Sequence, residues 1–127
     1  GLVAVAIGKL LDNKPVEVWG DGSAIRDYIY IDDLAKIVYQ LIDKDVHNES
    51  VNIGCGRGYS VNDVLAFLKI ISKVDFKIEY ENARPMDVSN MVLDTTKMLK
   101  YVDIELTPML KGMEKFYQES LKDNNHA

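Results

Sequence analysis

The amino-acid sequence predicts one compact domain of the mixed α/β class. Its 127 residues, 47% of them apolar, are enough for one core that buries about two-thirds of the surface of the unfolded chain. Segments with helical spacing of apolar residues alternate along the chain with short strand-like segments. The sequence has no internal repeat and no linker rich in Pro, Gly or Ser. We therefore expect a single domain over residues 1–121 and a frayed tail over 122–127.

The first third of the sequence predicts a helix followed by two short strands. Residues 1–14 are mostly apolar, but Lys9 and Asp12 interrupt them well before the roughly 20 apolar residues that a membrane-spanning helix needs. This segment therefore predicts a core helix. Residues 16–19 (VEVW) and 27–31 (DYIYI) predict strands, and the sequence GDGS after the first of them predicts a turn.

The middle of the chain predicts two amphipathic helices with a strand between them. Residues 32–43 have apolar side chains at helical spacing, and Asp32 is the expected N-cap. The predicted apolar face consists of Leu34, Ile37, Val38, Leu41 and Ile42. Residues 50–54 (SVNIG) predict a strand. Ser60 and Asp63 have the spacing of a capping box and open the second helix. Its predicted apolar side chains are Val64, Leu65, Phe67, Leu68 and Ile71.

The last third predicts one strand and two further helices. Residues 76–80 (FKIEY) alternate as a strand, and Asp94 is expected to cap a short helix over 95–102. Pro108 stands at the first position of the last helix, where a missing N–H costs nothing, and the helix is expected over residues 109 to about 121.

Composition limits the classes of function. The formal charge of −5 argues against nucleic acid or an anionic membrane as the main partner. His47 and His126 lack the spacing of metal ligands, and a single cysteine, Cys55, excludes a Cys-rich zinc site, so we expect no metal. One cysteine also fits a reducing compartment, which makes the cytoplasm the expected location.

The sequence NIGCGRGYS at residues 52–60 is a candidate phosphate-binding loop. Gly54 and Gly56 fit the first two positions of the dinucleotide fingerprint G-x-G-x-x-G, but Tyr59 occupies the third and Gly58 falls one residue early. The acidic residue that should follow about 20 positions later is also displaced. The sequence therefore favours a tight glycine turn between strand and helix over a dinucleotide site.

Two arginines on loops beside strands are candidate ligands for an anion. Arg26 follows the turn GDGS, and a surface ion pair with Asp21 or Asp27 is an equally good explanation of it. Arg84 lies on a later loop. Because guanidinium groups bind phosphate oxygens bidentately, two separated arginines could hold a diphosphate. Asp87, close to Arg84, could accept hydrogen bonds from sugar or ribose hydroxyls.

Four segments of the chain carry a resemblance to a known family. They are, in order, GDGSAIRDYIYIDDLAKIV, VNIGCGRGYSVNDV, RPMDVSNMVLDTTKM and LTPMLKGMEKFY. In order and spacing they resemble the C-terminal portion of the extended short-chain dehydrogenase/reductases, the NAD-dependent nucleotide-sugar epimerases and dehydratases, and among these most the UDP-glucose 4-epimerases. The resemblance covers nearly the whole chain. It implies a small mixed α/β substrate-binding domain, with the NAD-binding Rossmann domain absent from this chain.

The resemblance implies roles for several residues. Arg26 and Arg84 would contact the diphosphate of a UDP-sugar, and Asp87 would bind the ribose. The strand that would border the uracil contains Glu17, Val18 and Trp19. No catalytic residue is expected, because none of the tyrosines is followed four residues later by the lysine of the family's Tyr-x-x-x-Lys motif. A strand aromatic such as Trp19 is also common in a core.

The resemblance implies that this chain is the nucleotide-sugar-binding part of a longer, cytoplasmic epimerase. NAD would be bound by an N-terminal Rossmann domain of the same protein and not by this chain, which alone would be inactive. An apolar face is expected where that domain would pack, and the full-length enzyme is a possible homodimer. Two alternatives stay open. One is the same domain of a nucleotide-sugar dehydratase, decarboxylase or reductase, and the other is a non-catalytic interaction module.

Overall fold

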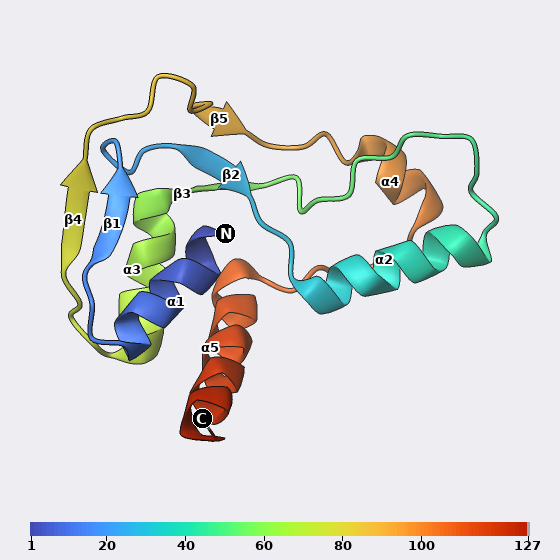
Figure 1. Ribbon diagram of the computed structural model, residues 1–127. Coiled ribbons are helices and arrows are strands. Elements are labelled where there is room, and N and C mark those ends of the chain that lie inside the picture. Colours follow the sequence, from blue (N-terminus) through green and yellow to red (C-terminus); the bar gives the residue numbers. More distant parts are fainter. Residues whose placement is uncertain (127) are drawn as a thin grey trace.

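The computed structural model describes residues 1–126, and its helices and strands confirm the predicted mixed α/β class. The elements are α1 (Leu2–Leu11), β1 (Val16–Trp19), β2 (Ile25–Asp27), α2 (Ile31–Asp43), β3 (Gly58–Ser60), α3 (Val61–Ser72), β4 (Ile78–Glu81), β5 (Asn90–Met91), α4 (Thr96–Tyr101) and α5 (Met109–His126). The β1–β4 sheet lies with α1, α3 and α5 at one end of the molecule, and α2 and α4 lie at the opposite end (Figure 1). The sheet β3–β2–β5 lies between these two ends.

Two segments of the chain, residues 16–27 and residues 78–91, run in the same direction through both sheets. β1 pairs in parallel with β4, and β2 pairs in parallel with β5, while β3 adds to β2 in antiparallel orientation. Trp19 lies opposite Glu81, and Ile25 lies opposite Asn90. Five residues (20–24) therefore connect the strands on the first segment and eight (82–89) on the second. The longer connection bulges outward from the molecule (Figure 1).

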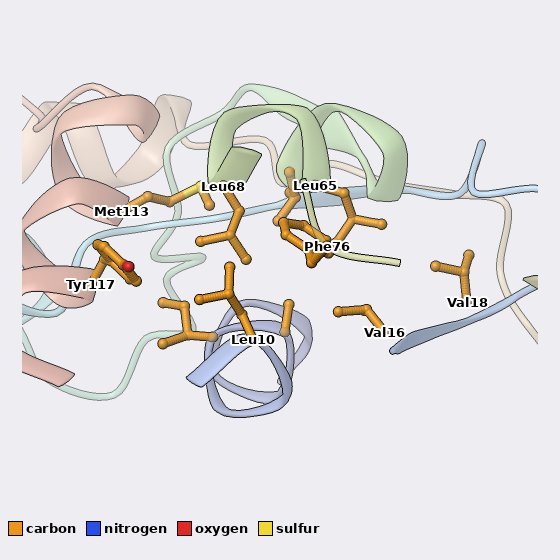
Figure 2. Close-up of a cluster of buried hydrophobic side chains, with 11 residues drawn as sticks. Leu10, Val16, Val18, Leu65, Leu68, Phe76, Met113 and Tyr117 are labelled. Atoms are coloured by element: carbon orange, nitrogen blue, oxygen red, sulfur yellow. The ribbon is translucent and has the colours of Figure 1, made fainter. Parts of the chain in front are cut away.

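The larger core lies between three helices and β1. Figure 2 shows Leu10 of α1, Leu68 of α3 and Tyr117 of α5 gathered around one apolar space, with Val16 and Val18 of β1 at its side. Each fully buried aliphatic side chain of this kind contributes about 1.5–3 kcal/mol. The predictions that residues 1–14 form a core helix and that the second amphipathic helix is buried through Val64, Leu65 and Leu68 are confirmed.

A smaller core holds α2 against α4. Ile37 of α2 and Met98 of α4 are fully buried there, and Leu41 packs against them. Val38 and Ile42, which the sequence predicts on the same buried face, are instead 39% and 73% exposed. The prediction for them is wrong because the described residues cover only one side of α2.

Two strand predictions are wrong. The strand expected over 27–31 ends at Asp27, and α2 already begins at Ile31. The physical reason is the partner strand, because β5 has only two residues and leaves the segment after Asp27 without a ladder. Residues 50–54 form no strand either, and β3 lies later, at Gly58–Ser60. The strand expected at 76–80 is present but shifted, as β4.

Predictions for helix ends are correct for one helix and need correction for others. The capping box of Ser60 and Asp63 is confirmed by reciprocal hydrogen bonds. Asp32 is not the N-cap of α2, since Tyr30 is, but it lies in the first turn, where a carboxylate is favourable to the helix dipole. The last helix does not end near Leu121, because α5 continues through His126 over most of the expected frayed tail. Residue 127 lies outside the described residues.

Candidate functional site

The glycine loop after residue 53 has its backbone donors occupied by an internal carboxylate. Asp27 Oδ1 accepts a hydrogen bond from the Cys55 N–H at 2.8 Å, and Oδ2 accepts one from the Gly56 N–H at 2.9 Å. The Leu93 N–H also donates to Oδ2, at 3.3 Å. Gly56 has a φ of 71°, which favours glycine there. The sequence favoured a tight turn here, but it did not indicate that Asp27 fills the turn as an anion would.

Arg84 and Asp87 lie together on the bulging connection 82–89. A turn joins them, because the Asp87 N–H donates to the Arg84 C=O at 3.1 Å. Both side chains are exposed. The Arg84 guanidinium carbon lies over the Trp19 ring, 4.0 Å from its centroid, and Trp19 is itself 46% exposed. The structure thus brings Arg84 to Trp19 at the end of β1, and Asp87 lies in the same turn as Arg84.

The backbone of β1 is free along one edge. The Val16 N–H donates to the Lys77 C=O and the Gly20 N–H to the Glu81 C=O, both at 2.9 Å, so every second residue of β1 faces β4. The N–H and C=O groups of Glu17 and Trp19 therefore point the other way. No strand pairs with that edge within residues 1–126.

The side chains of the same strand alternate between core and solvent. Val18 is only 2% exposed and packs in the larger core, and its N–H and C=O groups face β4, so neither its side chain nor its backbone polar groups are open to a ligand at the free edge. The exposed Glu17 carboxylate pairs with Lys9 Nζ at 3.2 Å. Of the three predicted uracil neighbours, only Trp19 has an exposed side chain outside a salt bridge, and Arg84 lies over its ring.

Arg26 lies half-buried on β2, the central strand of the three-stranded sheet. Its Nη1 donates to the Ile25 C=O at 2.8 Å. Neither ion pair considered from the sequence forms, because no carboxylate of the described residues lies within 4.0 Å of Arg26. Asp27 cannot reach it, since neighbouring residues of a strand point to opposite faces of the sheet. The connection 82–89 is also joined to β2. The C=O of Ser89, its last residue, accepts a hydrogen bond from the Ile25 N–H at 2.9 Å.

An apolar groove of about 650 Å³ lies between α1, residues 28–31 and the start of α5. Its apolar lining includes Leu2, Val3, Tyr28, Tyr30, Met109 and Phe116. Ile31 lines the groove and also begins the exposed side of α2, where Val38, Tyr39 and Ile42 follow. An open apolar surface of this extent is typical of a contact with another protein surface.

Other groups in the described part of the chain offer no catalytic or metal chemistry. Burial raises the pKa of Tyr28, although nearby Arg26 opposes the rise, so this tyrosine is unsuited to act as a base. Residues with metal-binding side chains do not gather in groups of three or more within the described residues. None of the described helices combines the length and the apolar character needed to cross a membrane.

Comparisons with known proteins show which proteins the chain is similar to. Residues 1–54 match the NAD dependent epimerase/dehydratase family. A provisionally named UDP-glucose 4-epimerase of Methanocaldococcus jannaschii is 34% identical, over 76% of this chain and 31% of that protein. A GDP-6-deoxy-D-talose 4-dehydrogenase of Aggregatibacter actinomycetemcomitans is 32% identical, over 86% of this chain and 38% of that protein.

A solved structure extends the match over almost the whole chain. UDP-glucose 4-epimerase of Thermotoga maritima with UDP-glucose has a TM-score of 0.86 and 31% identity, over 97% of this chain and 40% of that one. The chain therefore spans well under half the length of the proteins that it matches. The resemblance seen in the four sequence motifs is confirmed: the chain is similar to proteins of the NAD-dependent epimerase/dehydratase family, which are extended short-chain dehydrogenase/reductases.

Proposed function

We propose that this chain binds the nucleotide of a UDP-sugar, as the C-terminal part of a sugar epimerase such as UDP-glucose 4-epimerase. The observation that carries the proposal is the position of Arg84 over Trp19, at the end of the free edge of β1. This arrangement puts an unpaired cation beside backbone groups that can bind a base. The solved relative that contains UDP-glucose supports the same class of ligand.

The free edge of β1 suits the uracil ring. Uracil presents an N–H donor between two carbonyl acceptors, and the backbone of Glu17 and Trp19 presents both C=O and N–H groups on one edge. Hydrogen bonds of this kind require no particular side chain. They explain how Glu17 can border the base although its side chain is paired with Lys9. Val18 would lie between the two residues that bind, since its side chain is buried and its backbone groups face β4.

The two arginines suit the diphosphate. Arg84 has no carboxylate within 4.0 Å among the described residues, so its N–H donors are open to phosphate oxygens. Arg26 lies on the strand that follows the shorter connection, and one of its donors is used by the Ile25 C=O. Asp87, held in the turn with Arg84, would accept hydrogen bonds from the ribose hydroxyls.

We propose that the described residues of this chain do not hold NAD. The glycine loop that could hold its diphosphate donates instead to Asp27. We infer that NAD, which supplies hydride transfer at a sugar carbon when it is bound, is held by a Rossmann domain of the same longer protein. The apolar groove and the exposed side of α2 are the surface on which that domain would pack. The chain alone would then be inactive, and the whole protein would be a cytoplasmic isomerase.

The same domain of a GDP-sugar dehydrogenase or reductase is the second candidate. The relative from Aggregatibacter is named for a GDP-sugar and is nearly as similar in sequence as the Methanocaldococcus one. Both candidates would use the same diphosphate site, but guanine and uracil present different patterns of hydrogen-bond donors and acceptors to the edge of β1. Comparison of UDP with GDP therefore separates them.

Titration of the 127-residue chain with UDP, UDP-glucose and GDP-mannose, followed by amide NMR, tests the proposal. We expect saturable shifts at residues 17–19 and 84–87 that favour the uridine ligands. Arg84→Ala should weaken UDP binding about tenfold or more, the scale of a lost charge-assisted hydrogen bond. Arg57→Ala is the matched control, because Arg57 is an exposed arginine on the glycine loop, just before β3, which belongs to the other sheet.

The possible outcomes are distinct. A preference for the guanosine ligand with the same shifted residues would favour the second candidate. No shift with any nucleotide, or equal losses in Arg84→Ala and Arg57→Ala, would refute the proposal and leave an interaction module as the better explanation.

A further inference from the structure

The position of the Arg84 backbone is fixed by contacts at both ends of its connection. On one side the Gly20 N–H extends the ladder to Glu81, and Ala83 lies beside Gly20, since a Cβ added at Gly20 would be in ordinary van der Waals contact with the Ala83 Cβ, at 3.6 Å. On the other side Pro85 restricts the backbone after Arg84. The start of the Arg84 side chain is thus set relative to β1 by backbone contacts alone.

The end of the Arg84 side chain has a single described contact. Its guanidinium carbon lies 4.0 Å from the centroid of the Trp19 ring, and the structure gives it no hydrogen bond or ion pair within the described residues. Arg26 differs, since it is half-buried and donates to the Ile25 C=O. An exposed arginine without such a contact would sample many rotamers, at a cost when a ligand has to immobilise it.

We propose that Trp19 is a positioning residue that holds the Arg84 guanidinium ready for the diphosphate, a role that rests on the proposed nucleotide-sugar function. A cation over the face of an aromatic ring is held by the ring quadrupole and does not use its N–H donors. All five donors of the Arg84 side chain therefore stay available to phosphate oxygens. A carboxylate partner would hold the side chain too, but it would compete with the ligand for the same donors.

The proposal separates two possible roles of Trp19. If Trp19 only contacts the base, its removal weakens binding of UDP but leaves binding of inorganic pyrophosphate unchanged. If it positions Arg84, its removal weakens binding of both. Since a cation–π contact at an exposed site is modest, the expected loss of affinity is about two- to fivefold.

Calorimetric titration of the 127-residue chain at low ionic strength, with inorganic pyrophosphate and with UDP, tests this role. We expect Trp19→Leu to weaken pyrophosphate binding about two- to fivefold and Trp19→Phe, which keeps an aromatic face, to restore most of it. In an Arg84→Ala background, Trp19→Leu should cause no further loss for pyrophosphate, because the two residues act as a pair. Trp19 is the single tryptophan of the chain, so its fluorescence should also change in Arg84→Ala without ligand.

Unchanged pyrophosphate affinity in Trp19→Leu, with UDP still bound by the wild-type chain, would overturn the positioning role and leave the nucleotide site intact. The positioning role would also be overturned if Trp19→Leu caused the same loss of pyrophosphate affinity in the wild-type chain and in Arg84→Ala. Failure of the wild-type chain to bind UDP would instead refute the proposed function, and this inference with it. Should Trp19→Leu fold poorly, the fluorescence of Trp19 in Arg84→Ala provides the independent test, because an unchanged fluorescence would by itself contradict the contact.

Discussion

The Asp27 carboxylate joins three segments that are far apart in the sequence, and its replacement by Asn should destabilise the fold. Its two oxygens accept hydrogen bonds from Cys55, Gly56 and Leu93 at 2.8, 2.9 and 3.3 Å. Asn has nearly the same shape but only one acceptor oxygen, so its NH₂ group would face an N–H donor. One half-buried donor left without a partner costs about 1–3 kcal/mol. We expect Asp27→Asn to lower the free energy of unfolding by about that amount.

Urea unfolding followed by circular dichroism measures the effect. Asp43→Asn is the matched control, because Asp43 is exposed at the end of α2, makes no described hydrogen bond, and should change stability by less than about 0.5 kcal/mol. Amide exchange adds a local measurement, in which Cys55 and Gly56 should lose protection in Asp27→Asn. Equal stability of the two variants, with protection retained, would show that the carboxylate does not hold the loop.

Two smaller predictions concern a helix cap and a turn. Hydrogen bonds from Ser60, chiefly from its side chain, hold the pKa of Asp63 below its ordinary value of 3.8, so the stability from this cap is present at neutral pH and is lost as the pH falls through the lowered pKa. Ser60→Ala should cost about 1 kcal/mol and return the pKa of Asp63 toward its ordinary value, which carboxyl NMR can measure. Gly22→Ala should cost about 1–3 kcal/mol in thermal unfolding, because Gly22 has a φ of 79° and an added Cβ would collide with the side-chain amide of Asn62. Gly8→Ala is its control with the opposite sign, since an added Cβ there meets no atom within 4 Å and alanine is the better helix former.

The features that the sequence predicted correctly depend on contacts between near neighbours in the chain. The capping box of Ser60 and Asp63 spans three residues, and the buried faces of α1 and α3 follow from spacings of three and four. Such signals are complete within one turn of helix. For α2 the same kind of signal was misleading. Val38 and Ile42 are apolar, but they lie on a side of the helix that the described residues leave exposed.

The features that the sequence did not predict depend on distant partners. Asp27 was considered as an ion-pair partner of its neighbour Arg26, but its hydrogen bonds reach 28 residues to Cys55 and 66 residues to Leu93. The pleat of β2 turns the two neighbours to opposite faces. The contact of Arg84 with Trp19 likewise depends on the register of β1 against β4 and on the unequal lengths of the two connections, which no local pattern encodes.

A nucleotide-sugar bound as proposed would connect the two sheets. The free edge of β1 lies in the sheet that packs on the larger core, and Arg26 lies in the other sheet. Arg84 lies on the exposed connection between the two sheets. A ligand that binds only the folded chain stabilises it by about 2.7 kcal/mol at a concentration of 100 Kd. UDP should therefore raise the melting temperature of the wild-type chain. Arg84→Ala, which binds UDP about tenfold more weakly, should lose about half of this rise or more at equal ligand concentration. Asp27→Asn should keep the rise while melting lower without ligand. If UDP shifted both variants equally, the residues that stabilise the fold and those that bind the ligand would not be separate, and the assignment of Arg84 to the ligand and Asp27 to the fold would be wrong.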